Sequence, residues 1–90
     1  LIYLLRINED FFKIGITRVS LVNRLKGIKS KARIKGGENI SIETVATKQG
    51  TLYNCFLLEQ RILEENREFR IYTKWSTELL KQLEVSRYFN

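Results

Sequence analysis

Two short apolar segments at the start of the chain constrain its fold most, because only three polar residues separate them. LIYLLRI occupies residues 1–7 and FFKIGIT occupies residues 11–17, with the turn-forming sequence NED at residues 8–10. Runs of this length that are rich in Ile and aromatic residues and are separated by such a turn predict a β-hairpin.

The length of the turn also predicts the register of the hairpin. We expect Ile7 to pair with Phe11 across the turn. In that register Tyr3 lies opposite Gly15. Because side chains alternate between the two faces of a strand, Tyr3, Lys13 and Gly15 then share one face of the sheet.

A segment with helical spacing of its apolar residues follows the hairpin. Ser20 is the predicted N-cap of a first helix, with Thr17 as the alternative, and glycines 36–37 are its predicted end. Between them apolar residues recur at helical spacing: Leu21, Leu25, Ile28 and Ala32. Residues 39–48 alternate between apolar and polar side chains, which predicts a third strand.

The second half of the chain predicts two more helices. The first covers residues 51–69 and the second residues 78–89, with residues 70–76 as an aromatic connection. The predicted order is therefore β-β-α-β-α-α. We expect residues 1–90 to form one small α/β (α+β) domain, with a three-stranded antiparallel sheet flanked by helices.

Composition restricts the chemistry available to this chain. It has no histidine and a single cysteine, Cys55, which excludes an intramolecular disulfide and metal sites built from Cys or His. No run approaches the roughly 18 apolar residues of a membrane span, and no signal peptide opens the chain, so we expect a cytoplasmic protein that is neither secreted nor bound to a membrane. Because methionine is absent even at position 1, we also expect further DNA-binding or other domains outside these residues.

The charge balance favours a polyanionic partner. Sixteen lysines and arginines stand against 10 acidic residues, which gives a net charge of +6 and a pI of about 9.7. Nucleic acid is the commonest partner of such a chain. The alternative is a soluble surface that is basic without a nucleic-acid partner.

Glu59 is a charged residue at an apolar position of the predicted helix 51–69. It lies four residues after Cys55 and four before Leu63, which places it within or beside the buried stripe. A buried, unpaired carboxylate costs several kcal/mol or takes up a proton. Three explanations are open: a buried Lys or Arg partner, a position at the rim of the stripe, or a role as metal ligand or catalytic carboxylate.

Three other residues each have an ordinary structural explanation. Tyr3 suits a core aromatic with a solvated hydroxyl, and Lys13 suits an edge lysine whose stem lies on apolar surface. Arg24 lies at the margin of the apolar stripe of the first helix, where a solvated or ion-paired arginine is common. Together with Glu59, however, they are compatible with one cluster in a basic protein.

The order of these residues resembles the GIY-YIG nuclease superfamily. LIY at residues 1–3 resembles the first motif, with Leu in place of the usual Gly. KIGIT at residues 13–17 resembles the second motif of a phage and bacterial branch, with Lys in place of the usual Tyr. Arg24 and Glu59 fit the family's arginine and its metal-binding glutamate, and STELLK at residues 76–81 resembles a Thr-Glu-aromatic segment of the same branch.

The resemblance implies a metal-dependent endonuclease that hydrolyses DNA phosphodiester bonds. Glu59 would bind one Mg²⁺ or Mn²⁺, and Arg24 would offset charge on the scissile phosphate. Tyr3 would position the attacking water and accept its proton if its pKa were lowered by Lys13 or the metal. Lys13 has the alternative role of binding the phosphate itself. Gly15, which has no side chain, would let a phosphate or the Tyr3 ring approach the backbone.

The resemblance further implies a basic surface on the first helix that follows the DNA backbone. Its residues would be Lys26, Lys29, Lys31, Arg33 and Lys35. DNA is the expected partner, with RNA as the alternative, in a bacterial or phage-infected cell. Two other hypotheses stay open: a catalytically silent relative that only binds nucleic acid, and a protein-interaction module that uses the apolar residues within 79–88.

Overall fold

The hairpin forms with the predicted register. In the computed structural model, which describes residues 1–90, β1 (Ile2–Ile7) and β2 (Phe11–Ile16) pair antiparallel, and Tyr3 lies opposite Gly15. Odd-numbered residues of β1 therefore face one side of the sheet and even-numbered residues the other.

The sheet has five strands, so the prediction of three was wrong. β3 (Ile42–Lys48) pairs with β1 on one side of the hairpin. On the other side β5 (Leu79–Leu80) pairs with β2, and β4 (Arg70–Ile71) pairs with β5. All four pairings are antiparallel, and the strand order is β3-β1-β2-β5-β4.

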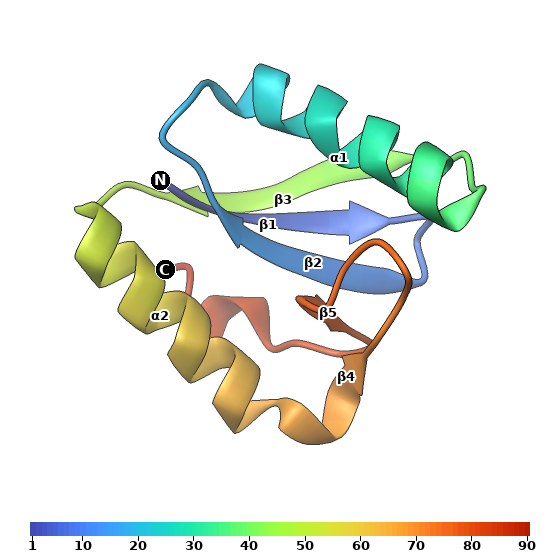
Figure 1. The fold of residues 1–90 in the computed structure, drawn as a ribbon. Helices are drawn as coiled ribbons and strands as arrows, with labels where there is room; N and C mark the ends of the chain where they lie inside the picture. The colour runs from blue at the N-terminus through green and yellow to red at the C-terminus, as the bar shows by residue number, and fades with distance from the viewer.

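Two helices cover opposite faces of this sheet (Figure 1). α1 (Leu21–Gly36) begins at the predicted cap, where the Ser20 hydroxyl accepts a hydrogen bond from the Asn23 N–H, and it ends at Gly37, whose φ of 68° suits glycine. α2 (Leu52–Glu65) is shorter than predicted, because the chain leaves the helix after Glu65 and forms a 3₁₀ turn at Arg67–Phe69. Neither helix is long and apolar enough to cross a membrane.

The predicted third helix over residues 78–89 was wrong. Leu79 and Leu80 form β5, and only Val85–Arg87 is helical, as a 3₁₀ turn. Adjacent residues of a strand point to opposite faces, and here both faces are covered, so Leu79 packs on the α1 side and Leu80 on the α2 side. The apolar stripe that an interaction module would have used is therefore not an exposed helix face.

The core has two halves, one on each face of the sheet. The half beneath α2 contains Ile2, Leu4, Phe12, Ile14, Cys55, Ile62, Leu63, Leu80 and Tyr88. The half beneath α1 contains Tyr3, Leu5, Ile7, Ile28, Ala32, Ile40, Trp75 and Leu79. Since the two halves meet at the hairpin, β1 and β2 are the best-buried segments and form a rigid base for side chains at their edges.

Candidate active site

A cleft opens at the uncovered edge of β2. β5 pairs only with Phe12 and Lys13, and the Ile14 N–H donates to the Glu78 carbonyl oxygen at 3.0 Å. The Gly15–Ile16 edge beyond has no neighbouring strand on that side. The cleft here has a volume of about 300 Å³, and its polar lining residues are Tyr3, Lys13, Arg24, Lys31, Glu59 and Glu78.

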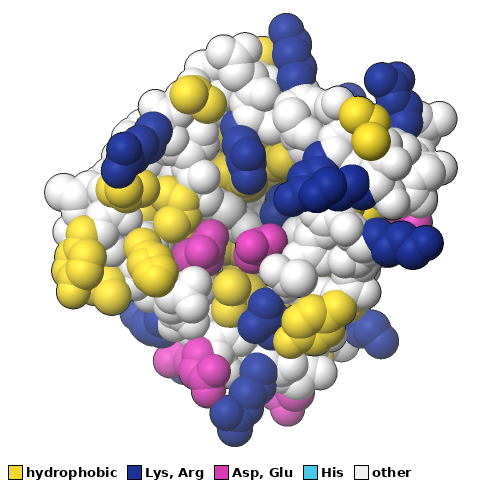
Figure 2. Space-filling model, in the orientation of Figure 1, with side chains coloured by type: hydrophobic (Ala, Val, Ile, Leu, Met, Phe, Trp, Pro, Cys, Tyr) yellow, Lys and Arg dark blue, Asp and Glu magenta, His cyan; other side chains and the backbone are white.

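The four predicted catalytic residues all line this cleft, although they come from four different elements. Tyr3 is on β1, Lys13 on β2, Arg24 on α1 and Glu59 on α2. Figure 2 shows acidic side chains near the middle of this face, with lysine and arginine side chains above them. The fold thus brings together residues that are up to 56 positions apart in the sequence.

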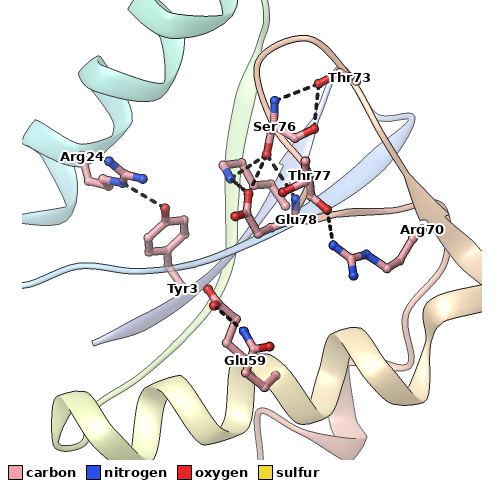
Figure 3. Close-up of polar contacts among 10 residues, drawn as sticks. Tyr3, Arg24, Glu59, Arg70, Thr73, Ser76, Thr77 and Glu78 are labelled. Atoms are coloured by element: carbon pink, nitrogen blue, oxygen red, sulfur yellow. Dashed lines mark hydrogen bonds and ion pairs between the residues drawn. The ribbon is translucent and has the colours of Figure 1, made fainter.

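Tyr3 and Arg24 form a direct contact across the cleft. The Arg24 Nε–H donates a hydrogen bond of 3.1 Å to the Tyr3 hydroxyl (Figure 3). Gly15 lies opposite Tyr3, and a Cβ atom at that position would overlap the Tyr3 ring and its hydroxyl. Of the two explanations for Gly15, approach by the Tyr3 ring is therefore the one that the packing shows.

The environment of Tyr3 keeps its hydroxyl protonated. Burial raises the pKa of Tyr3, while the hydrogen bond and charge of Arg24 act in the opposite direction without overcoming the effect of burial. The charges of Glu59 and Glu78 also raise the pKa of Tyr3. Without a bound metal ion, Tyr3 is thus a neutral phenol at neutral pH.

Lys13 belongs to a buried hydrogen-bonded cluster rather than to a solvated strand edge. Its side chain is nearly inaccessible, and its Nζ donates to Ser76 Oγ at 2.9 Å and to Glu78 Oε2 at 3.4 Å. The Ser76 hydroxyl in turn donates to Glu78 Oε2 at 3.0 Å (Figure 3). Burial lowers the pKa of Lys13, and the Glu78 carboxylate opposes that effect.

Glu59 is half-buried on the α2 side of the cleft and has no ion-pair partner. Its one hydrogen bond comes from the adjacent Gln60 side chain, at 3.3 Å. Burial and the nearby charge of Glu78 raise the pKa of Glu59. Of the three explanations for this residue, a buried basic partner is therefore excluded. A position at the rim and a role as ligand are both compatible with the geometry.

The basic residues of α1 do not form one surface. Lys31 lines the cleft, whereas Lys26, Lys29 and Arg33 line a separate shallow groove with Ser30, Asn39 and Ile40. Lys35 lines neither. The helical period explains the division, because Arg33 lies about 180° around the helix from Arg24.

Sequence reasoning missed Ser76 and Glu78 as site residues. The sequence pattern predicts Glu78 at the start of a helix and Ser76 in the connection before it. Their contacts with Lys13 depend on the two-residue strand β5 beside β2. A signal was available in the resemblance of STELLK to a motif of the same branch, which singled out this segment without giving it a role.

Mg²⁺ or Mn²⁺ is the ion that the family resemblance implies, and the cleft contains two carboxylates, Glu59 and Glu78. No three or more His, Cys, Asp or Glu side chains cluster anywhere in the chain. Mg²⁺, however, keeps several of its waters and is commonly held by one or two carboxylates. The charge of Glu78 contributes to the raised pKa of Glu59, so a cation beside Glu59 would relieve an unfavourable interaction that the fold already contains.

Comparison with known proteins returned no relatives. No protein-family model matches this chain, and no curated protein or solved structure is significantly similar to it.

Proposed function

We propose that this chain is a metal-dependent endonuclease domain that hydrolyses DNA phosphodiester bonds in the cleft beside β2. The observation that carries the proposal is the convergence of Tyr3, Lys13, Arg24 and Glu59 on one cleft. The net charge of +6 supports a nucleic-acid substrate.

Arg24 is the residue that we assign to the scissile phosphate. Only its Nε–H is hydrogen-bonded within the protein, so the terminal N–H groups are available for phosphate oxygens. A guanidinium in this place offsets the negative charge that develops on those oxygens in the transition state.

Tyr3 orients the attacking water. Its hydroxyl accepts a hydrogen bond from Arg24, so its own proton points to a different acceptor, such as the water oxygen. The raised pKa favours this orienting role over proton abstraction by the protein alone. The Arg24 contact joins the phenol to the residue that we assign to the phosphate.

Lys13 and Glu59 complete the charge pattern of the site. Lys13 uses two N–H groups on Ser76 and Glu78, which leaves the third for a substrate oxygen in the cleft that it lines. Glu59 would hold the divalent cation, which when bound polarises the phosphate and makes a bound water more acidic.

A catalytically silent DNA-binding relative is the second candidate. The specific observation in its favour is that Tyr3 is neutral and that Lys13, already paired with Ser76 and Glu78, replaces the second tyrosine of the family pattern. Such a protein would bind DNA through the same basic side chains and would not need a metal.

Cleavage of a short end-labelled DNA duplex separates the two candidates. We expect the label to move to shorter products with Mg²⁺ or Mn²⁺ and to stay in the intact strand with EDTA. Fluorescence anisotropy of the same duplex in EDTA measures binding alone. Binding that weakens with salt but produces no cleavage would support the silent relative. A duplex that is neither bound nor cleaved would contradict both candidate functions.

A further inference from the structure

Gly27 lies at an energetically unfavourable place for a glycine, in the middle of α1. Among the common residues only proline is less favourable than glycine in a helix interior, because glycine loses the most backbone freedom on folding. A glycine at such a position suggests a reason in packing or in binding.

No packing reason exists for Gly27. A Cβ atom built at this position meets no protein atom within 4 Å. Two other glycines provide a contrast, because a Cβ at Gly15 would overlap the Tyr3 ring and one at Gly36 would lie 2.8 Å from Cδ1 of Trp75. Alanine or a larger side chain at position 27 would therefore project into the open cleft.

The space above Gly27 lies between two cationic side chains. Arg24, Gly27 and Lys31 follow one another at helical spacings of three and four residues, and all three line the cleft. Along the helix axis Arg24 and Lys31 are about 10 Å apart. The exposed helix backbone at Gly27 is thus the low point between two positive charges.

We propose that a DNA backbone crosses α1 at Gly27, where the missing side chain lets a phosphodiester approach the helix between Arg24 and Lys31. This inference deepens the proposed function and rests on it, since it adds a subsite that guides the strand toward the cleft. The role of Gly27 is steric, while the two flanking cations supply the attraction to phosphate.

Substitutions at Gly27 test the subsite, with Val22 as a matched control. Val22 is also on α1, is 63% exposed and lines none of the grooves described above. Gly27→Ala, Gly27→Gln, Val22→Ala and Val22→Gln are compared by thermal unfolding and by anisotropy of a labelled duplex in EDTA. These measurements do not depend on catalysis.

We expect function and stability to change in opposite directions at Gly27. Gly27→Ala should raise the midpoint of thermal unfolding by roughly 2–8 °C, because alanine is the better helix former. Gly27→Gln should weaken duplex binding at least tenfold, and Gly27→Ala by a smaller factor. The two Val22 variants should bind as the wild type does.

Several results would overturn this subsite. Unchanged affinity in Gly27→Gln would do so, and so would a lower unfolding midpoint in Gly27→Ala, which would mean that the position is not open. A wild type that binds the duplex without cleaving it would overturn the nuclease but leave the subsite supported if Gly27→Gln still weakens binding. A wild type that does not bind the duplex at low salt would overturn both the Gly27 subsite and the proposed nuclease function.

Discussion

The Nε–H of Arg24 donates a hydrogen bond of 3.1 Å to the hydroxyl of Tyr3, which joins α1 to β1 at the edge of the cleft. Tyr3 lines the cleft wall but is 0% exposed, and its ring occupies the space that Gly15 leaves open. Because packing already fixes the Tyr3 ring, the hydrogen bond mainly restrains the exposed Arg24 side chain.

Tyr3→Phe separates the chemical role of the hydroxyl from the packing of the ring. We expect DNA cleavage to fall by about 100-fold or more, because the attacking water loses its orienting group. The stability should fall by only about 1 kcal/mol, since the phenyl ring still fills the space beside Gly15. Single-turnover cleavage and urea unfolding measure the two effects. Tyr53→Phe, at an exposed position of α2, is the control, and wild-type cleavage by Tyr3→Phe would refute the assigned role.

The raised pKa of Glu59 predicts a stability change that depends on pH. A carboxyl whose pKa is higher in the folded state than in the unfolded state favours folding only while it is protonated, and this contribution is lost as pH rises through the folded-state pKa. We therefore expect Glu59→Gln to raise the unfolding temperature at pH 7. The difference should vanish below about pH 4, where both states of the wild type are protonated.

Thermal unfolding in EDTA at the two pH values checks the prediction for Glu59. Added Mg²⁺ should then stabilise the wild type more than Glu59→Gln, because only the wild type offers the carboxylate. Equal unfolding temperatures at pH 7 would show that the half-buried Glu59 carboxylate does not destabilise the fold.

Glu78→Gln is predicted to make Lys13 lose its proton at lower pH. Burial lowers the pKa of Lys13 and the Glu78 charge opposes this, so removing that charge lowers the pKa further. The nearby Arg24 lowers it as well, and Glu59 raises it. If Lys13 acts as a cation toward the phosphate, the alkaline limb of the pH–rate profile should move to lower pH. Glu84→Gln, at an exposed position, should leave the profile unchanged.

The same variant should also be less stable at neutral pH. Burial opposes ionisation of Glu78, but the charge of Lys13 and the hydrogen bond from Ser76 together lower its pKa below the ordinary value. Its contribution is therefore present above the unfolded-state pKa and is lost as pH falls through the folded-state pKa. Glu78→Gln with wild-type stability at pH 7 would contradict the importance of the Lys13–Ser76–Glu78 cluster.

Lys31 is predicted to contribute to the salt dependence of DNA binding. A lysine that contacts a phosphate of duplex DNA contributes about 0.9 to the slope of log affinity against log salt. Lys31 lines the cleft, so Lys31→Gln should weaken binding and reduce the slope by about that amount. Lys81→Gln, at an exposed position outside the cleft, should change neither. A salt titration of anisotropy gives the slopes, and equal slopes for Lys31→Gln and the wild type would place Lys31 away from the DNA.

The hairpin, α1 and most of α2 were predictable because local rules determine them. A short turn and a period of two residues specify the pairing of Tyr3 with Gly15, and Ser20 and Gly37 mark the ends of α1. Glu59 stands out because it interrupts an apolar helical stripe. These features require no knowledge of the rest of the fold.

The C-terminal segment could not be predicted in the same way. β4 and β5 are only two residues long and are strands only because each has a partner in the sheet. Leu79–Leu80 fits a helical pattern equally well until both faces of the sheet are known to be covered. Ser76 and Glu78 were missed for this reason. The helical period alone, however, predicts that Lys31 lies on a different side of α1 from Lys26, Lys29 and Arg33.

The initial rate at which the protein nicks supercoiled plasmid in Mg²⁺ depends directly on the metal site that we propose at Glu59. The wild type is compared with Glu59→Gln and with Glu64→Gln, a glutamate on the same helix that is exposed and lies outside the cleft. We expect nicking by the wild type and by Glu64→Gln, and a rate at least about 100-fold lower for Glu59→Gln. A wild type that does not nick the plasmid, or a Glu59→Gln variant that nicks it at the wild-type rate, would contradict the claim that this cleft is a metal-dependent nuclease site.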